Sequence, residues 1–253
     1  MSREGNEAAA GRVERLRGGI IRGPLDRRAL ALCYTGHEFG ECLPQILDDL
    51  ARRRAKASFF FTGDFLRNPE FHTVVERLVH EGHYLGPHSD KHLLYCEWSP
   101  ERPTLVTRAQ FDADLLANLR EIEGYGMPRQ QVRYYIPPYE HYNEEVVAWS
   151  QALGLTLINY TPGTLSVADW TPADHPRYRS TSEIFESIYR REAEDPYGLN
   201  GFLLLMHAGA GPGRPDKSSS RLAELLDHLQ ARGYALLRVD ELLEGDATTG
   251  APA

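Results

Sequence analysis

Residues 30–61 read LALCYTGHEFGECLPQILDDLARRRAKASFFF, in which two short apolar runs flank an amphipathic segment. The runs Leu30–Tyr34 and Ala57–Phe61 have the length and composition of buried strands. Between them, apolar residues at i, i+3, i+4 and i+7, counted from Leu43, form one stripe of a helix. A strand, a helix and a second strand in this order predict a right-handed βαβ unit with parallel strands.

The same alternation continues along the chain. The predicted strands are Leu30–Tyr34, Ala57–Phe61, Tyr84–Gly86, Val132–Ile136, Leu155–Asn159, Phe202–Met206 and Tyr234–Val239. Helices are predicted after Asn68–Pro69, after a capping box formed by Thr107 and Gln110 and ending near Gly124, and over 144–153, 182–191 and 220–232. About seven such units in one run favour a single-domain α/β barrel over an open sheet.

Composition narrows the class of protein. The 253 residues carry 28 Lys and Arg against 36 Asp and Glu, a formal charge of −8, which disfavours nucleic-acid binding. No apolar stretch approaches the roughly 18 residues of a membrane span, and the N-terminus lacks the apolar core of a signal peptide. We therefore expect a cytoplasmic protein with a barrel domain over 18–244 between flexible ends, 1–17 and 245–253.

Polar residues gather directly after the predicted strands, where barrel enzymes carry their chemistry. Half of the ten histidines lie there: His37, His88, His92, His141 and His207. His88 and His92 are four residues apart, so both imidazoles would project from one face of a helical turn. Two imidazoles and a carboxylate form a common catalytic zinc shell. His207, at the end of a strand, is predicted either to donate a proton to a leaving group or simply to be hydrogen-bonded there.

Several of these motifs resemble the polysaccharide deacetylase family (carbohydrate esterase family 4, the NodB-homology fold). The resemblance covers residues 18–243 and rests on His88-Ser89-Asp90-Lys91-His92, Leu205-Met206-His207, Ala57-Ser58-Phe59-Phe60 with Thr62-Gly63, and Pro137-Pro138-Tyr139. It implies an irregular (β/α)7 barrel and a divalent metal, usually zinc. It also implies removal of acetyl groups from N- or O-acetylated sugars, with His207 as general acid and the Tyr139 N–H binding the oxyanion.

The chain departs from the family pattern at its first motif. Thr35 stands where the family has its general-base aspartate, and Gly36 stands where it has a metal-binding aspartate. Ile136 replaces the arginine that pairs with the base in the family. Loss of both partners of an ion pair is physically coherent, because either charge left alone would be costly.

A working site then needs a different third ligand and a different base. We predict Asp64, His88 and His92 as the metal shell, with His37 as the main competitor for the third place. Glu38 and Glu140 are close alternatives for the base. The substrate is predicted to be an acetylated carbohydrate, with a small non-sugar amide or ester as the alternative. A second alternative is a non-catalytic sugar-binding protein. Asp169-Trp170 resembles the end of a further family motif, and Tyr142, Tyr160, Trp98 and Trp170 are candidates for a sugar-stacking surface.

Overall fold

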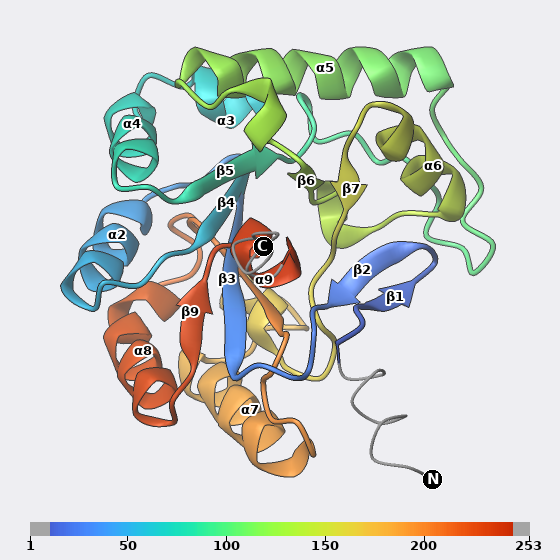
Figure 1. Cartoon of the computed structure of the whole chain (residues 1–253). Helices are drawn as coiled ribbons and strands as arrows, with labels where there is room; N and C mark the ends of the chain where they lie inside the picture. Colours follow the sequence, from blue (N-terminus) through green and yellow to red (C-terminus); the bar gives the residue numbers. More distant parts are fainter. Residues whose placement is uncertain (1–10, 245–253) are drawn as a thin grey trace, which may run out of the picture.

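The computed structural model describes residues 11–244 and is built around one fully buried strand, β3 (Ala29–Gly36) (Figure 1). Parallel strands β5 (Tyr84–Pro87), β4 (Ser58–Phe61), β3 and β8 (Leu203–His207) follow one another in the central sheet. The short strand β9 (Ala235–Leu237) pairs with the first residues of β3. Residues of β3 are apolar on both faces because helices cover one face and the barrel interior the other.

Two further parallel strands, β6 (Tyr134–Tyr135) and β7 (Thr156–Leu157), continue the wall beyond β5. Single backbone–backbone hydrogen bonds join this pair of strands to β5 on one side and to β8 on the other. Ile136 N–H donates to Pro87 O over 3.3 Å, and Thr161 N–H donates to Leu203 O over 3.0 Å. The wall therefore closes from β5 through β6 and β7 to β8, which confirms the predicted single-domain α/β barrel.

Side chains of the strands separate into two apolar clusters. Ala31, Cys33, Phe60, Leu203 and Leu205 belong to the cluster that fills the barrel. Their neighbours along each strand pack under the helices in a second, larger cluster. This two-residue alternation decides which polar side chains emerge at the carboxyl ends of the strands.

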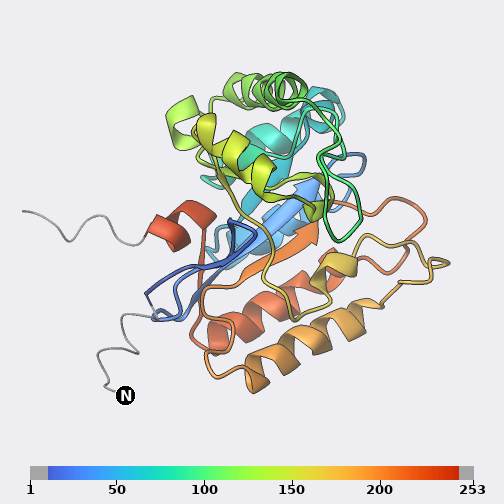
Figure 2. The ribbon, with the colours of Figure 1, turned by 90° about the vertical axis from the view of Figure 1, so that its right-hand side faces the viewer.

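The helices surround the strands, with α7 and α8 on one side and α5 on the opposite side (Figures 1 and 2). Their bounds are α2 (Leu43–Arg52), α3 (Gly63–Arg67), α4 (His72–His80), α5 (Arg108–Gly124), α6 (Glu144–Ala152), α7 (Thr181–Glu194), α8 (Leu222–Ala231) and α9 (Val239–Glu244). The capping box of Thr107 and Gln110 and the end of α5 at Gly124 are as predicted. No helix within residues 11–244 combines the length and apolar character needed to cross a membrane.

Three local predictions were wrong. Residues up to 17 were expected to be loose, but β1 (Glu14–Leu16) pairs with β2 (Gly19–Arg22) in an antiparallel hairpin. Helix α4 begins at His72, because Asn68 instead accepts the Glu70 N–H in a turn. The last predicted strand is shorter, since Val239 already begins α9. The expected flexible ends at 1–10 and 245–253 lie outside the described residues.

Candidate active site

The mouth of the barrel is formed by the layer of side chains directly above the interior cluster. On β3 the alternation of Ala31 and Cys33 continues to Thr35, and on β8 that of Leu203 and Leu205 continues to His207. Thr35 and His207 are register partners on these neighbouring parallel strands, so their side chains share one face of the sheet. His88 follows β5, the strand beyond β4.

His207 is held by a buried carboxylate. Its Nδ1 donates to Asp169 Oδ1 over 2.7 Å, and its backbone N–H donates to Asp169 Oδ2 over 3.1 Å. Ser218 Oγ donates to the same Oδ2 over 3.0 Å. Burial lowers the pKa of His207, but the charge and hydrogen bond of Asp169 outweigh burial, so the pKa lies above its usual value. His207 therefore tends to stay protonated, with Nε2 as the free donor.

Glu140 enters the mouth from the short helix η2 (Pro138–Glu140) after β6. Tyr139 and Glu140 both adopt left-handed backbone conformations, with φ of 59° and 52°. Such conformations cost about 1–3 kcal/mol each in residues other than glycine and cluster at functional sites. The turn is fixed by Asn159, whose Nδ2 donates to Glu140 O over 2.7 Å. Burial raises the pKa of Glu140 to about 7, and the charges of His207 and Asp169 also act on this carboxyl.

Three histidines from two loops lie together, and the ring of one of them, His92, lies 4.3 Å from that of Tyr139 between centroids. The ring centroids of His88 and His92 are 5.1 Å apart, and those of His37 and His92 are 4.6 Å apart with nearly parallel planes. The His88 Nδ1 donates to Ile136 O over 2.9 Å, which leaves Nε2 as an acceptor. Burial places the pKa of His88 well below its usual value and lowers that of His92 to about 3. Both rings therefore act as neutral imidazoles.

The predicted helical turn at His88–His92 was wrong. Ser89 and His92 have φ of 77° and 54°, so the segment is an irregular turn that brings the rings together by another route. Helix α5 fixes that turn from behind. Asp114 accepts from Ser89 Oγ over 2.7 Å and from the Lys91 N–H over 3.0 Å. Asn118 Oδ1, one turn further along α5, accepts the His88 N–H over 2.8 Å.

Asp114 and Asn118 were missed in the sequence. The available signal was two polar residues on the buried face of an amphipathic helix, four positions apart. Buried polar side chains are normally hydrogen-bonded, so their positions indicated a buried polar loop against α5.

The residues of the mouth do not fit a complete metal shell. Within residues 11–244, no group of three or more His, Cys, Asp and Glu side chains is placed to hold a metal ion. The stacked rings of His37 and His92 lie face to face. His37 Nδ1 lies 3.1 Å from Thr62 Oγ1.

Asp64, the preferred third ligand, is engaged elsewhere. Its carboxylate accepts from Arg67 Nη2 over 2.8 Å and from Lys91 Nζ. Burial raises the pKa of Asp64, but the hydrogen bonds from Lys91 and Arg67 dominate and lower it below its usual value. The structure thus places Asp64 in a half-exposed ion-pair cluster and does not bring it together with His88 and His92, which corrects that assignment.

The space beside Gly36 is already filled. A Cβ atom at this position would lie 2.9 Å from the Phe61 ring and 3.2 Å from the Phe65 ring. Gly36 therefore faces aromatic side chains of the helix-covered cluster, and an aspartate there would require those rings to move.

The other predicted site residues differ in how far their side chains are exposed to solvent. Glu38 is exposed on the loop after β3, whereas Glu140 is half-buried in the mouth, so the structure favours Glu140 as the base. Trp98 and Trp170 are exposed, with Trp98 packed on His141 at 4.1 Å and Trp170 6.2 Å from His207 between ring centroids. Tyr142 is buried and donates to Leu16 O over 2.8 Å, so it belongs to the packing and not to a sugar-stacking surface.

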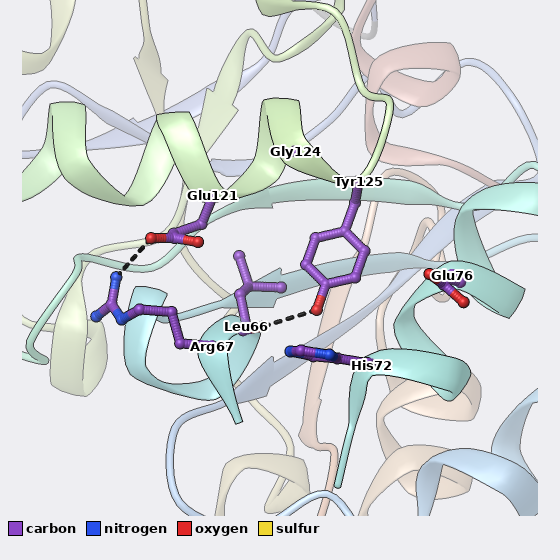
Figure 3. A pocket seen from close by; sticks show the side chains of 7 residues that line it. All are labelled: Leu66, Arg67, His72, Glu76, Glu121, Gly124 and Tyr125. Carbon is purple, nitrogen blue, oxygen red and sulfur yellow. Dashed lines mark hydrogen bonds and ion pairs between the residues drawn. The ribbon is translucent and has the colours of Figure 1, made fainter. Parts of the chain in front are cut away.

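A depression of about 460 Å³ lies away from this mouth, between α3, α4 and α5 (Figure 3). Several of its polar groups are paired within the protein: Arg67 pairs with Glu121 over 3.0 Å, and Tyr125 Oη donates to Leu66 O over 2.6 Å. The mouth, which holds Glu140, the pair of His207 and Asp169, and the three histidines, is the better candidate for an active site.

A closed parallel barrel whose titratable side chains meet at the carboxyl ends of its strands defines a (β/α)-barrel protein with an enzyme-like site. The family model for polysaccharide deacetylases matches residues 22–158, more than half of the chain, so the protein belongs to the polysaccharide deacetylase family.

Curated relatives agree with this family. The chain is 26% identical over 213 residues to a chitooligosaccharide deacetylase of Bradyrhizobium, covering 79% of this chain and 84% of the relative. It is 25% identical over 223 residues to a peptidoglycan-N-acetylglucosamine deacetylase of Bacillus cereus, covering 87% and 90%.

Among solved structures, a carbohydrate esterase family 4 pseudoenzyme from Bacillus anthracis has a similar fold. Its TM-score is 0.69 at 21% identity, over 90% of this chain and 69% of that chain. A family 4 carbohydrate esterase from the same organism gives a TM-score of 0.64 at 23% identity, over 89% and 87%.

Proposed function

We propose that the protein removes acetyl groups from an acetylated carbohydrate, with Glu140 as general base and His207 as general acid. One observation carries the proposal: the 2.7 Å pair of His207 and buried Asp169 shares the mouth with a carboxyl group whose pKa is about 7. The pKa values of both groups are raised, that of Glu140 by burial and that of His207 by Asp169, and a carboxylate and a protonated histidine in one mouth can serve as the base and the acid of a hydrolysis. The family and its named deacetylases supply the substrate class.

In the proposed reaction, the Glu140 carboxylate takes a proton from a water molecule as its oxygen attacks the acetyl carbon. His207 then gives its Nε2 proton to the leaving nitrogen or oxygen as the bond to the acetyl carbon breaks. The products are acetate and a free amine or hydroxyl on the sugar. Asp169 stabilises the imidazolium before transfer and holds the ring, because it accepts from Nδ1 and from the backbone of the same residue.

The family pattern predicts two further roles, a metal site and an oxyanion donor. No step described above depends on either. We propose that His88 and His92 bind a divalent ion, with zinc as the first candidate, once the His92 ring turns away from the ring of His37 on which it is stacked. We also propose that the Tyr139 N–H binds the oxyanion.

Acetate release tests the proposal. Purified protein is incubated with N-acetylated chitooligosaccharides, acetylated peptidoglycan fragments, an O-acetylated xylan and simple acetamides, with and without added zinc. We expect acetate from at least one carbohydrate and none from the variant Glu140→Gln/His207→Asn. Release only from the acetamides would replace the carbohydrate with the small-amide alternative.

A non-catalytic sugar-binding protein is the second candidate, favoured by Gly36 and by the lack of a converging metal group in residues 11–244. It predicts that the same oligosaccharides bind the parent and the double variant equally, with no acetate released by either.

A further inference from the structure

The mechanism above does not use the hydroxyl of Thr35, which lies at the mouth of the barrel. Thr35 is only 2% exposed, and none of the residues in 11–244 donates to or accepts from its Oγ1. A buried polar group without a partner is destabilising, and native proteins keep few of them. Each such group in a native structure needs an explanation, and a role toward a bound group is one of them.

The direction of this hydroxyl follows from the strand geometry. Cys33, two residues earlier, belongs to the cluster that fills the barrel, so the Thr35 side chain continues that interior face toward the mouth. Its register partner on β8 is His207, the proposed acid. Tyr34 and Gly36, the neighbours along the strand, instead face the helix-covered cluster. Thr35 thus lies at the floor of the mouth beside His207.

Two other buried threonines, Thr62 and Thr161, have hydroxyl groups with hydrogen-bond partners and serve as a comparison. Thr62 Oγ1 accepts the Phe65 N–H over 3.1 Å and lies 3.1 Å from His37 Nδ1. Thr161 Oγ1 donates to Ile21 O and accepts the Leu203 N–H over 2.9 Å. Both are buried, yet each has partners on two sides. The contrast indicates that Thr35 is not held in place by polar contacts of its own.

We propose that the Thr35 hydroxyl binds the acyl oxygen of the substrate, and likewise a carboxylate oxygen of the acetate product. A hydroxyl donates to either oxygen in the same geometry and carries no charge to be neutralised. This assignment rests on the proposed function, because it names the atom of that substrate which the floor of the site recognises.

The test uses three variants and two measurements. Thr35→Val removes the hydroxyl without changing the shape, Thr35→Ser keeps the hydroxyl, and Thr161→Val makes the same change at a satisfied threonine. The measurements are the melting temperature without ligand and the affinity for acetate, followed by NMR titration. Acetate binding is independent of turnover, so it separates this proposal from the proposed function.

We expect Thr35→Val to raise Tm by about 2–4 °C, because an unpaired buried hydroxyl is removed. Thr161→Val should lower Tm. Acetate affinity should fall about tenfold in Thr35→Val, the effect of one lost hydrogen bond, and be retained in Thr35→Ser and Thr161→Val. Where Thr35→Val is poorly folded, Thr35→Ala replaces it, because it also removes the hydroxyl, and Thr35→Ser remains the control that keeps it.

Two results would overturn the assignment. A lower Tm in Thr35→Val, similar to that of Thr161→Val, would show that the hydroxyl is structural. Acetate that binds Thr35→Val as tightly as the parent, or fails to bind the parent, would show that Thr35 does not hold an acyl oxygen. If the parent binds acetate through Thr35 but releases none from any substrate, the proposed function fails and this assignment stands.

Discussion

Histidines lie on both sides of the mouth, but their pKa values are shifted in opposite directions. On the β8 side, Asp169 accepts from the ring and the backbone of His207, and the pKa of that histidine lies above its usual value. On the side of β3 and β5, the rings of His88 and His92 lie against one another without such a carboxylate, and burial lowers their pKa. One carboxylate therefore decides whether a buried histidine here is an acid or a neutral ring.

The Glu140 carboxyl interacts with the β8 side. Burial raises its pKa to about 7, the charge of Asp169 adds to this rise, and the charge of His207 opposes it. Glu140 ionises near neutrality, and the pKa of His207 is also raised above its usual value. We therefore propose proton transfer for Glu140 and His207, and binding for the neutral histidines.

Removing the acid should have the largest effect. We expect His207→Ala to lower acetate release by about 10²–10⁴-fold, the usual contribution of a positioned acid or base. His80→Ala, at an exposed position at the end of α4, is the matched control and should keep parent activity. Equal losses in both variants would remove His207 from the reaction, and the comparison of the two sides would lose its catalytic meaning.

Removing the base should be nearly as damaging and should also change the pH profile. Activity of the parent requires Glu140 ionised and His207 protonated, so the rate should fall as pH drops below about 7, the pKa of Glu140. We expect Glu140→Gln to lose about 10²-fold or more in rate and to lack this acidic limb. Glu38→Gln, at an exposed position, should retain both the rate and the limb. A profile that is unchanged in Glu140→Gln would contradict the assignment of the base.

Zinc binding tests the neutral side. We expect the double variant His88→Ala/His92→Ala to lose zinc, as measured by elemental analysis and calorimetry. Asp64→Asn should bind zinc like the parent, because the Asp64 carboxylate is already paired with Arg67 and Lys91. If folded Asp64→Asn loses zinc while His37→Ala retains it, the ion pairs must break on binding and Asp64 is the third ligand after all.

The smallest expected effect concerns stability. Folding raises the pKa of Glu140 from 4.5 to about 7, so the protein favours the protonated form. The resulting stability is present below pH 4.5 and is lost as pH rises through 7. Glu140→Gln should therefore be more stable than the parent by about 1–3 kcal/mol at pH 8 and similar to it near pH 4. Denaturant unfolding at both pH values measures the difference, and equal stability at pH 8 would argue that Glu140 is solvated.

The sequence predicted the barrel well because its signals are local. The apolar runs of β3, β4 and β8 and the capping box of α5 each depend on residues close together in the chain. The hairpin of β1 and β2 gave no such signal, since Glu14–Leu16 is mostly polar and exposed. Its place in the fold depends on long-range pairing of Ile20 with Ile158.

The sequence predicted the position of residues that follow a strand but not the partners that a side chain takes, and the roles of the site residues stay predictions. His88, His92 and His207 lie at the mouth, as their positions after strands predicted. Asp64 also follows a strand, but Arg67 one turn later and Lys91 on the next loop turn its carboxylate away. Glu38 and Glu140 could not be separated by sequence, because burial and a left-handed turn at Tyr139–Glu140 distinguish them.

The uneven wall of the barrel has a consequence for its motions. Strands β3 and β8 share five register pairs, whereas β6 meets β5 through one backbone–backbone bond of 3.3 Å from Ile136 to Pro87 and through the Tyr84 hydroxyl, which bonds the backbone of Arg133 and Tyr134. The His88 ring bonds the carbonyl of that same Ile136, so this histidine spans a join with little backbone pairing. Local opening should begin there, and the Ile136 amide should exchange with solvent deuterium sooner than amides of β3. A ligand that engages His88 should slow that exchange, making the amide a reporter of occupancy at the mouth.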